Sequence, residues 1–139
     1  FPAIPLTAGT SFYAAWYNCS SMTSFLATGM NLGTNFGYAW FNCSSLANFP
    51  ANVFDSWSPA SVSNNCFVGA WSNCTSLTAT SVENILNSLA TAGVAAPTSG
   101  VDITIDFDDT SGTPNITSAV ATLKGLSPAW TITLNGAAQ

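Results

Sequence analysis

The sequence predicts an α/β solenoid, in which the chain coils in turns of short parallel strand and short helix and ends in a helix-strand-helix-strand cap. Three observations lead to this prediction. A motif rich in aromatic residues occurs three times within the first 77 residues. After residue 79 the repeat gives way to a pattern typical of longer helices. Residues 101–107 then alternate apolar and polar side chains, as half-buried strands do.

The repeated motif has the pattern Phe-x-x-Ala-Trp-x-Asn-Cys-Ser/Thr-Ser-Leu/Met. It begins at Phe12, Phe36 and Phe67, at steps of 24 and 31 residues, and the longer step is expected to bulge from one face between Asn52 and Asn65. Its Phe, Ala, Trp and Cys recur at i, i+3, i+4 and i+7, which predicts one apolar stripe on a short helix. A short strand is expected after each Cys. The residues expected to form the core of the repeat are Phe12, Trp16, Cys19, Phe36, Trp40, Cys43, Phe67, Trp71 and Cys74.

Stacking gives a physical reason for the repeat. One coil of this length cannot bury its own Trp and Phe, whereas neighbouring coils can bury these side chains for one another. Each buried aromatic side chain contributes roughly 1.5–3 kcal/mol or more to stability. We therefore expect Trp16, Trp40 and Trp71 to lie one above another, as consecutive rungs of one coil.

The segment after the repeats is expected to begin with a helix. Thr80 and Glu83 match a capping box, an apolar stripe follows at helical spacing, and Gly93 is a typical helix stop. The alternation over residues 101–107 then predicts a strand.

A second helix and a last strand are expected beyond that strand. The pair Thr113-Pro114 predicts the start of a helix that ends at Gly125, and residues 130–134 predict the strand. We interpret residues 80–139 as a cap on the coils of residues 1–79, within one continuous domain.

The chain begins inside a repeat. Phe1-Pro2-Ala3 matches Phe49-Pro50-Ala51, and Gly9-Thr10 matches Gly33-Thr34. A stack that begins part-way through a coil leaves an apolar end face open. We therefore expect head-to-tail self-association through the open N-terminal coil, or else upstream repeats that cover it.

The motif, together with residues 49–55 and 81–89, resembles BspA-like leucine-rich-repeat surface proteins, and residues 123–134 are similar to the end of the same proteins. This resemblance implies a right-handed leucine-rich-repeat solenoid on a cell surface, an extracellular appendage or a phage tail fibre. It implies adhesion or recognition as the usual role, and no catalytic residues and no cofactor.

Charge is scarce in this chain. Only 5% of residues are charged, and Lys124 is the one cationic side chain, with no Arg and no His. Nothing can therefore neutralise a row of phosphates, which excludes nucleic acids and acidic membranes as partners. No run of about 18 apolar residues exists, so no membrane insertion is expected. A surface of Ser, Thr, Asn and Gly instead favours an extracellular location. Without His, a Ser or Cys nucleophile lacks its ordinary base, so we do not expect an enzyme.

Four asparagines satisfy the Asn-x-Ser/Thr rule for N-glycosylation, namely Asn18, Asn42, Asn73 and Asn115. In the three repeated sites the middle residue is Cys, which is unfavourable for glycosylation. An Asn at each corner of the coil has a structural use instead, because its amide can bond the backbone of the turn. Both interpretations stay open.

The repeat places Cys19, Cys43 and Cys74 at equivalent positions, where we expect them to stack as small buried side chains. A disulfide is the alternative, because adjacent coils are about 5 Å apart and the off-pattern Cys66 can pair with Cys74 or Cys43. A zinc site is not expected, since the chain has no His and no Cys-x-x-Cys pair.

Carboxylates gather near the predicted strand. Asp102, Asp106 and Asp108 are expected on one face of it, with Asp109 adjacent. Clustered carboxylates are what Ca²⁺ requires, although this spacing does not fit an EF-hand. The alternative is a solvated acidic strand edge that discourages wrong pairing.

These observations favour a non-enzymatic extracellular structural or adhesive protein, such as a head-to-tail protomer of a surface filament or fibre. The alternative is a receptor- or glycan-binding tip of a phage tail fibre or bacterial adhesin, in which Tyr13, Tyr38 and Trp57 stack on sugars or on a protein partner. Ice binding is a third class, suggested by the Thr-rich residues 130–133.

Overall fold

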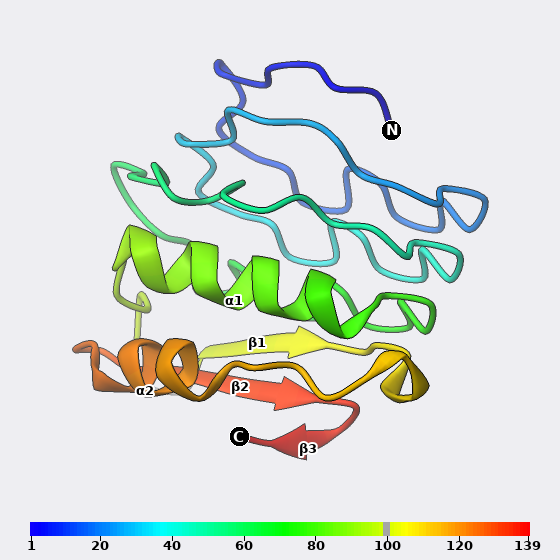
Figure 1. The fold of residues 1–139 in the computed structure, drawn as a ribbon. Coiled ribbons are helices and arrows are strands. Elements are labelled where there is room, and N and C mark those ends of the chain that lie inside the picture. The colour runs from blue at the N-terminus through cyan, green and yellow to red at the C-terminus, as the bar shows by residue number, and fades with distance from the viewer. Residues whose placement is uncertain (99–100) are drawn as a thin grey trace.

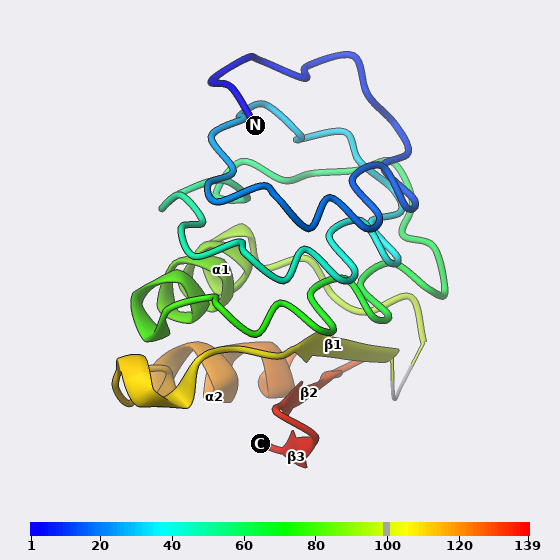
Figure 2. The same ribbon diagram turned by 90° about the vertical axis from the view of Figure 1, so that its right-hand side faces the viewer.

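The computed structural model describes residues 1–98 and 101–139. The chain winds in successive turns that lie one above another, from the N-terminal turn to the sheet at the C-terminal end (Figure 1). Its regular elements are α1 (Ala79–Ala92), β1 (Val101–Ile105), the short 3-10 helix η1 (Asp109–Ser111), α2 (Thr117–Gly125), β2 (Trp130–Leu134) and β3 (Ala137–Ala138). The two α-helices lie on one side of the stack and the strands on the other (Figure 2).

Residues 1–78 contain turns and isolated β-bridges but no assigned helix or strand. The solenoid therefore stays a prediction. The short strands expected after Cys19 and Cys43 are reduced to a single bridge between Ser24 and Asn48, and no bridge follows Cys74 before α1.

The helix predicted within each repeat is wrong. Residues 13–18 and 37–42 form turns, in which Ala14 and Asn18 adopt φ values of 52° and 60° that an α-helix excludes. Tyr38 and Asn42 repeat the same conformation at 54° and 58°. The Phe and Trp of each motif are four residues apart, a spacing that places them on one face of a helix. Residues four apart also lie on the same side of an extended segment, because side chains there alternate every two residues. The spacing therefore does not distinguish the two conformations.

Backbone hydrogen bonds join the three copies of the motif into one ladder. Alternate N–H groups of residues 12–18 donate to carbonyl oxygens of residues 35–41, and those of residues 36–42 donate to residues 66–72, at 2.6–3.0 Å. All these N–H groups point toward the C-terminal end of the stack and all these carbonyl groups point toward the N-terminal end. The peptide units thus form hydrogen-bonded columns with aligned dipoles, as they do along an α-helix.

The expected aromatic stack is confirmed. The ring centroids of Trp16 and Trp40 are 5.2 Å apart with planes 13° apart, and those of Trp40 and Trp71 are 5.0 Å and 6° apart. Two further columns run beside the tryptophans, each with centroid spacings of 5.2–5.6 Å: Phe12, Phe36 and Phe67, and Phe1, Phe25 and Phe49. Aromatic stacking of this kind adds about 0.5–1.5 kcal/mol per pair to the burial of the rings.

Glycine explains the repeated Gly-x-x-Phe spacing. A Cβ atom on Gly33 would lie 2.3 Å from the tip of the Phe36 ring, and one on Gly9 would lie equally close to Phe12. The rings therefore rest directly on the backbone of their own turn, which only glycine allows.

The longer step between the second and third copies contributes to the core, contrary to the expected bulge. Val53, Phe54 and Trp57 are 5%, 0% and 2% exposed. The indole Nε1 of Trp57 donates to the carbonyl of Gly33 at 2.7 Å, and the Phe54 ring packs edge-on against Phe36. The extra residues thus insert two more aromatic side chains between the coils.

The predicted cap elements are present, with different boundaries. Thr78, and not Thr80, caps α1 by accepting a hydrogen bond from the N–H of Ser81, and Gly93 ends the helix in the left-handed conformation. The carboxylate of Glu83 accepts the N–H of Asn115 instead of closing a capping box.

The second half of the cap begins later than predicted. Helix α2 starts at Thr117 and leaves Thr113-Pro114 outside, and β1 ends at Ile105. Strands β1 and β2 pair in parallel, and β3, which was not predicted, pairs antiparallel to β2. None of the helices in the described part of the chain has the length and apolar character needed to cross a bilayer.

Candidate functional site

The two ends of the stack differ. At the N-terminal end, the carbonyl oxygens of Ser11, Tyr13, Ala15 and Tyr17 accept no hydrogen bond from any described residue. The corresponding carbonyls of the second copy all accept an N–H from the first. We call these four carbonyl groups the open edge. It consists of acceptors alone, because the N–H groups of the same segment donate to the coil below.

Apolar side chains surround the open edge. The large hydrophobic side chains that are exposed within residues 1–98 and 101–139 all come from the first 32 residues, and they are Phe1, Ile4, Tyr13, Tyr17, Leu26 and Leu32 at 37–55% exposed. Trp16 is 8% exposed, whereas Trp40 and Trp71 are fully buried. Exposed apolar side chains gathered at one end are typical of a surface that contacts another polypeptide.

The C-terminal end of the stack is closed by the chain itself. Strand β2 turns back at Asn135 and Gly136, whose φ values of 46° and 76° fit a tight hairpin, and β3 then covers the outer edge of β2. The N–H of Gln139 adds a further bond to Ile132, and Lys124 Nζ donates to the Gln139 carbonyl.

Side chains of the β1 region accept the last N–H groups of the columns. The N–H of Asn73 donates to the Asp106 carboxylate at 2.8 Å, and that of Gly69 donates to the Thr104 hydroxyl at 3.4 Å. The N–H of Trp71 donates to the Thr104 carbonyl. The sequence analysis missed this role, although the alternation of Thr104 and Asp106 on one face of the strand was a usable signal.

The four acidic residues considered for calcium do not converge. Asp102 accepts the hydroxyls of Thr104, Thr131 and Thr133, and Asp108 caps η1 by accepting the N–H of Thr110. Among residues 1–98 and 101–139, no three acidic or Cys side chains are grouped as a metal ion requires. The structure therefore does not gather Asp102, Asp106, Asp108 and Asp109 into one cluster, and the carboxylates of Asp102, Asp106 and Asp108 accept hydrogen bonds from local backbone or hydroxyl groups. The bonds from Thr131 and Thr133 also remove hydroxyls that an ice-binding face needs.

The cysteines follow the expected ladder only in part. Cys43 and Cys74 are buried, and their Sγ atoms donate to the carbonyls of Trp16 and Trp40 at 3.1 Å each. Cys19 occupies the same position in the first coil and is exposed. The proposed disulfide between Cys66 and Cys74 is not formed, since both are buried free thiols. Burial raises the pKa of Cys43 to about 11 and that of Cys66 to about 12, and it raises the pKa of Cys74 further.

The asparagines of the repeat have a structural role. Asn18, Asn42 and Asn73 all adopt φ values near 60°, a conformation in which Asn is favoured over most residues. The amide Nδ2 of Asn42 donates to Oδ1 of Asn18 at 2.9 Å, which joins two coils at their corners. Asn115 is exposed between η1 and α2, and it stays a glycosylation candidate, as do Asn18, Asn42 and Asn73.

The aromatic side chains suggested for sugar binding do not form one platform. Trp57 is buried, which corrects its assignment as an exposed ring. Tyr13 meets Tyr38 edge to face at 6.0 Å, and Tyr17 stacks on Phe41 at 5.0 Å. Phe41 covers one face of the Tyr17 ring, and ring faces are the surfaces that bind sugars.

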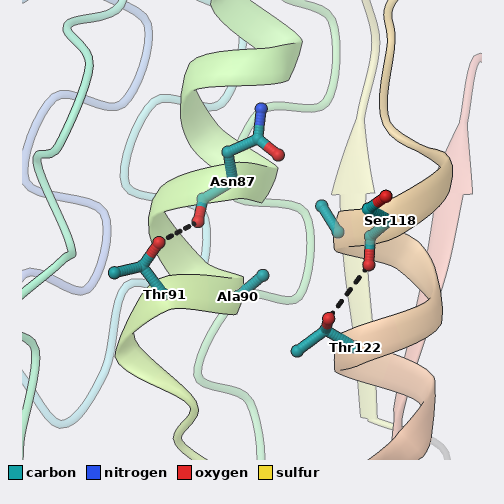
Figure 3. Close-up of a pocket in the computed structure, with 6 residues that line it drawn as sticks. Asn87, Ala90, Thr91, Ser118 and Thr122 are labelled. Atoms are coloured by element: carbon teal, nitrogen blue, oxygen red, sulfur yellow. Dashed lines mark hydrogen bonds between the residues drawn. The ribbon is translucent and has the colours of Figure 1, made fainter.

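Two hollows lie in the surface of the described residues. One lies between α1 and α2, where the hydroxyls of Thr91 and Thr122 donate back to Asn87 and Ser118 of their own helices (Figure 3). A second lies beside the β2 hairpin and is lined by Phe107, Thr113, Pro114, Ile116, Thr117, Leu134, Asn135 and Gln139. Neither is lined by a charged side chain.

Comparisons with family models, with curated proteins and with solved structures returned no match. The resemblance to BspA-like leucine-rich-repeat proteins therefore stays a prediction that rests on the motif. The candidate site with the most physical support is the N-terminal end of the stack.

Proposed function

We propose that this protein is a non-enzymatic structural or adhesive component of an extracellular filament or fibre, built as a solenoid whose N-terminal end is covered either by a neighbouring molecule or by upstream repeats. The observation that supports this proposal is the difference between the two ends. One end carries four unpaired carbonyl groups among exposed apolar side chains, and the other is closed by β3. Unpaired sheet-like edges promote association unless they are covered.

The rest of the surface supports a structural role. Only 5% of residues are charged, and the exposed polar groups are mostly hydroxyls and amides. The ladder columns and the three aromatic columns all run along one axis, so load applied along the stack is shared by many parallel contacts. These features suit a protein that carries force or displays a surface, and an extracellular location fits the scarcity of charge.

Self-association tests this proposal. Light scattering and electron microscopy of the purified chain should show assemblies that grow with protein concentration. The double variant Ile4→Asp, Leu26→Asp should remain monomeric, because it charges the N-terminal end while leaving the buried core unchanged. The double variant Thr80→Asp, Thr122→Asp, which places the same two charges on exposed positions of α1 and α2, is the matched control and should assemble normally. A wild-type chain that stays folded and monomeric over a wide range of concentrations rules out head-to-tail assembly through this end.

Recognition of a receptor or glycan is the second candidate. Tyr13 and Tyr17 are 55% and 46% exposed, which leaves their outer edges free for contact. A glycan array or a host-cell binding assay with wild type and Tyr17→Ala separates this candidate from assembly. Binding that is lost in Tyr17→Ala without a change in assembly favours recognition.

A further inference from the structure

The hairpin between β2 and β3 (Figure 1) contains a side chain that is both structural and chemically reactive. Its two-residue turn is Asn135-Gly136, and both residues have positive φ values, 46° and 76°, as a tight type I′ turn requires. Of the asparagines in the sequence, only Asn135 is followed by glycine. The turn therefore places a side-chain amide next to a peptide nitrogen whose own residue has no Cβ to hinder an approach.

The side-chain amide of Asn135 pairs with the backbone of Phe107. Its Oδ1 atom accepts the Phe107 N–H at 2.8 Å, and its Nδ2 atom donates to the Phe107 carbonyl at 3.2 Å. We call these two bonds the Phe107 clamp. They continue the pairing of β1 with β2 beyond the last strand pair, Ile105 with Leu134, so that a side chain takes the place of a peptide group.

Strand β3 is short, so the Phe107 clamp matters for the position of the hairpin. The two residues of β3, Ala137 and Ala138, are exposed and bury little apolar surface. Beyond β3, the N–H of Gln139 donates to the Ile132 carbonyl at 2.9 Å. Loss of the clamp is therefore expected to loosen the hairpin while the coils beneath it stay folded.

We propose that Asn135 is a site of spontaneous deamidation and that the Phe107 clamp controls the rate of this reaction. The Gly136 backbone nitrogen bonds to Cγ of Asn135, and the Cγ–Nδ2 bond breaks. The proton of the Gly136 N–H passes through water to the leaving amide nitrogen, which departs as ammonia. A second water molecule then opens the succinimide ring at either of its two carbonyl groups, which leaves aspartate or isoaspartate in place of Asn135.

The clamp opposes the first step. Its bonds hold Oδ1 and Nδ2 against Phe107, whereas reaction requires Cγ to turn toward Gly136, so the hairpin must open first. The product does not restore the clamp, because a carboxylate has no donor for the Phe107 carbonyl. Its new negative charge also adds to a segment that already carries Asp106 and Asp108. Deamidation thus acts as a slow, one-way release of β3 from the outer edge of β2.

Mass spectrometry of the whole protein kept at neutral pH measures the reaction. Peptide mapping should place the change at Asn135 and not at Asn87, an exposed asparagine followed by serine in α1. A flexible peptide with the sequence of residues 130–139 should deamidate at least about tenfold faster than the folded protein, because the protein must first break two hydrogen bonds. Equal rates overturn control by the clamp. A folded protein that keeps the amide through an incubation about a hundredfold longer than the peptide half-time overturns the site itself.

Two substitutions at Phe107 isolate the clamp from the packing of the ring. Phe107→Pro and Phe107→Ala both remove the ring, but only proline also removes the N–H that donates to Asn135. Phe107→Pro should deamidate at least about threefold faster than Phe107→Ala. Equal rates in the two folded variants overturn the clamp. If Phe107→Pro does not fold, the comparison of protein with peptide still decides the question.

Hydrogen exchange tests the release of β3. In Asn135→Asp, which reproduces one product, the N–H groups of Asn135 and Gln139 should exchange faster than in the wild type, and the ladder N–H of Trp40 should not. Asn87→Asp adds the same charge to α1 and should leave all three unchanged. Wild-type protection at Gln139 in Asn135→Asp overturns the release, and so does an equal loss of protection at Trp40.

Discussion

The indole rings of Trp40 and Trp71 lie parallel, with centroids 5.0 Å apart, and the Nε1 atom of each is buried without a hydrogen-bond partner. A buried N–H without a partner is costly, so the stack must gain more from ring contact than it loses there. This balance indicates that the tryptophan column is the energetic centre of the fold.

Removal of one ring from this column should greatly reduce the stability of the protein. Trp40→Ala leaves a large cavity between two rings and is expected to lower the free energy of unfolding by about 3–5 kcal/mol. Trp40→Phe should cost less, because it keeps an aromatic ring and removes the unpaired N–H. Urea unfolding measures both, with the exposed Tyr17→Ala as control. A loss in Trp40→Ala no larger than in the control would contradict the central role of the stack.

The left-handed corner at Asn42 predicts an unusual order of substitutions. Both Asn42→Gly and Asn42→Ala lose the amide bond to Asn18, but only Gly adopts a φ of 58° without strain. Asn42→Ala should therefore be less stable than Asn42→Gly by about 1–2 kcal/mol. Chemical unfolding of the pair provides the measurement. Asn87→Ala on α1 is the control and should not lower the stability. Equal stability of the Asn42→Gly and Asn42→Ala variants would contradict the strain expected for Ala at this positive φ.

We expect the Asp106 carboxylate to stabilise the fold by accepting a hydrogen bond. Asp106→Ala leaves the Asn73 N–H at the end of its column without this partner and is expected to cost about 0.5–1.5 kcal/mol. Asp106→Asn keeps an acceptor and should cost less. Asp109→Ala removes an exposed carboxylate from the same segment and serves as control. Thermal unfolding that ranks Asp109→Ala below Asp106→Ala in stability would contradict this role.

The buried thiols predict a loss of stability at alkaline pH. Burial raises the pKa of Cys43 from 9.0 to about 11 and that of Cys66 from 9.0 to about 12, and the pKa of Cys74 moves in the same direction. In this range the unfolded chain loses these protons first, so unfolding becomes more favourable as pH rises above 9. Each thiol contributes a slope of about 1.4 kcal/mol per pH unit until its folded pKa is reached.

Chemical unfolding at a series of pH values between about 8 and 11 checks this dependence. This range begins below the pKa of a free thiol and extends to the raised pKa of Cys43. Cys66→Ala should flatten the curve, and Asn87→Ala, which removes no thiol, should leave it unchanged. A thiol reagent should label Cys19 rapidly in the folded chain and the other three only on unfolding. A curve that Cys66→Ala leaves unaltered would contradict the burial effect.

The sequence by itself determined the repeat and its stack. The recurrence of Trp16, Trp40 and Trp71 in one motif predicted that the rings meet, because equivalent positions in stacked coils face the same space. The alternation in β1 and the stop at Gly93 likewise follow from local chemistry, since backbone conformation there depends on near neighbours.

Only the tertiary structure decided how the backbone of each repeat bonds. The helix predicted from Phe12 to Cys19 is absent, because alternate N–H groups find carbonyl partners in the next coil, and a spacing of four residues does not reveal which partner prevails. The same contacts point every ladder carbonyl group in one direction. The carbonyl groups of the first coil therefore lack donors, and the Asn73 N–H of the last coil donates to the Asp106 carboxylate. No pattern within a single repeat encodes that direction, since it arises when one coil is placed on another.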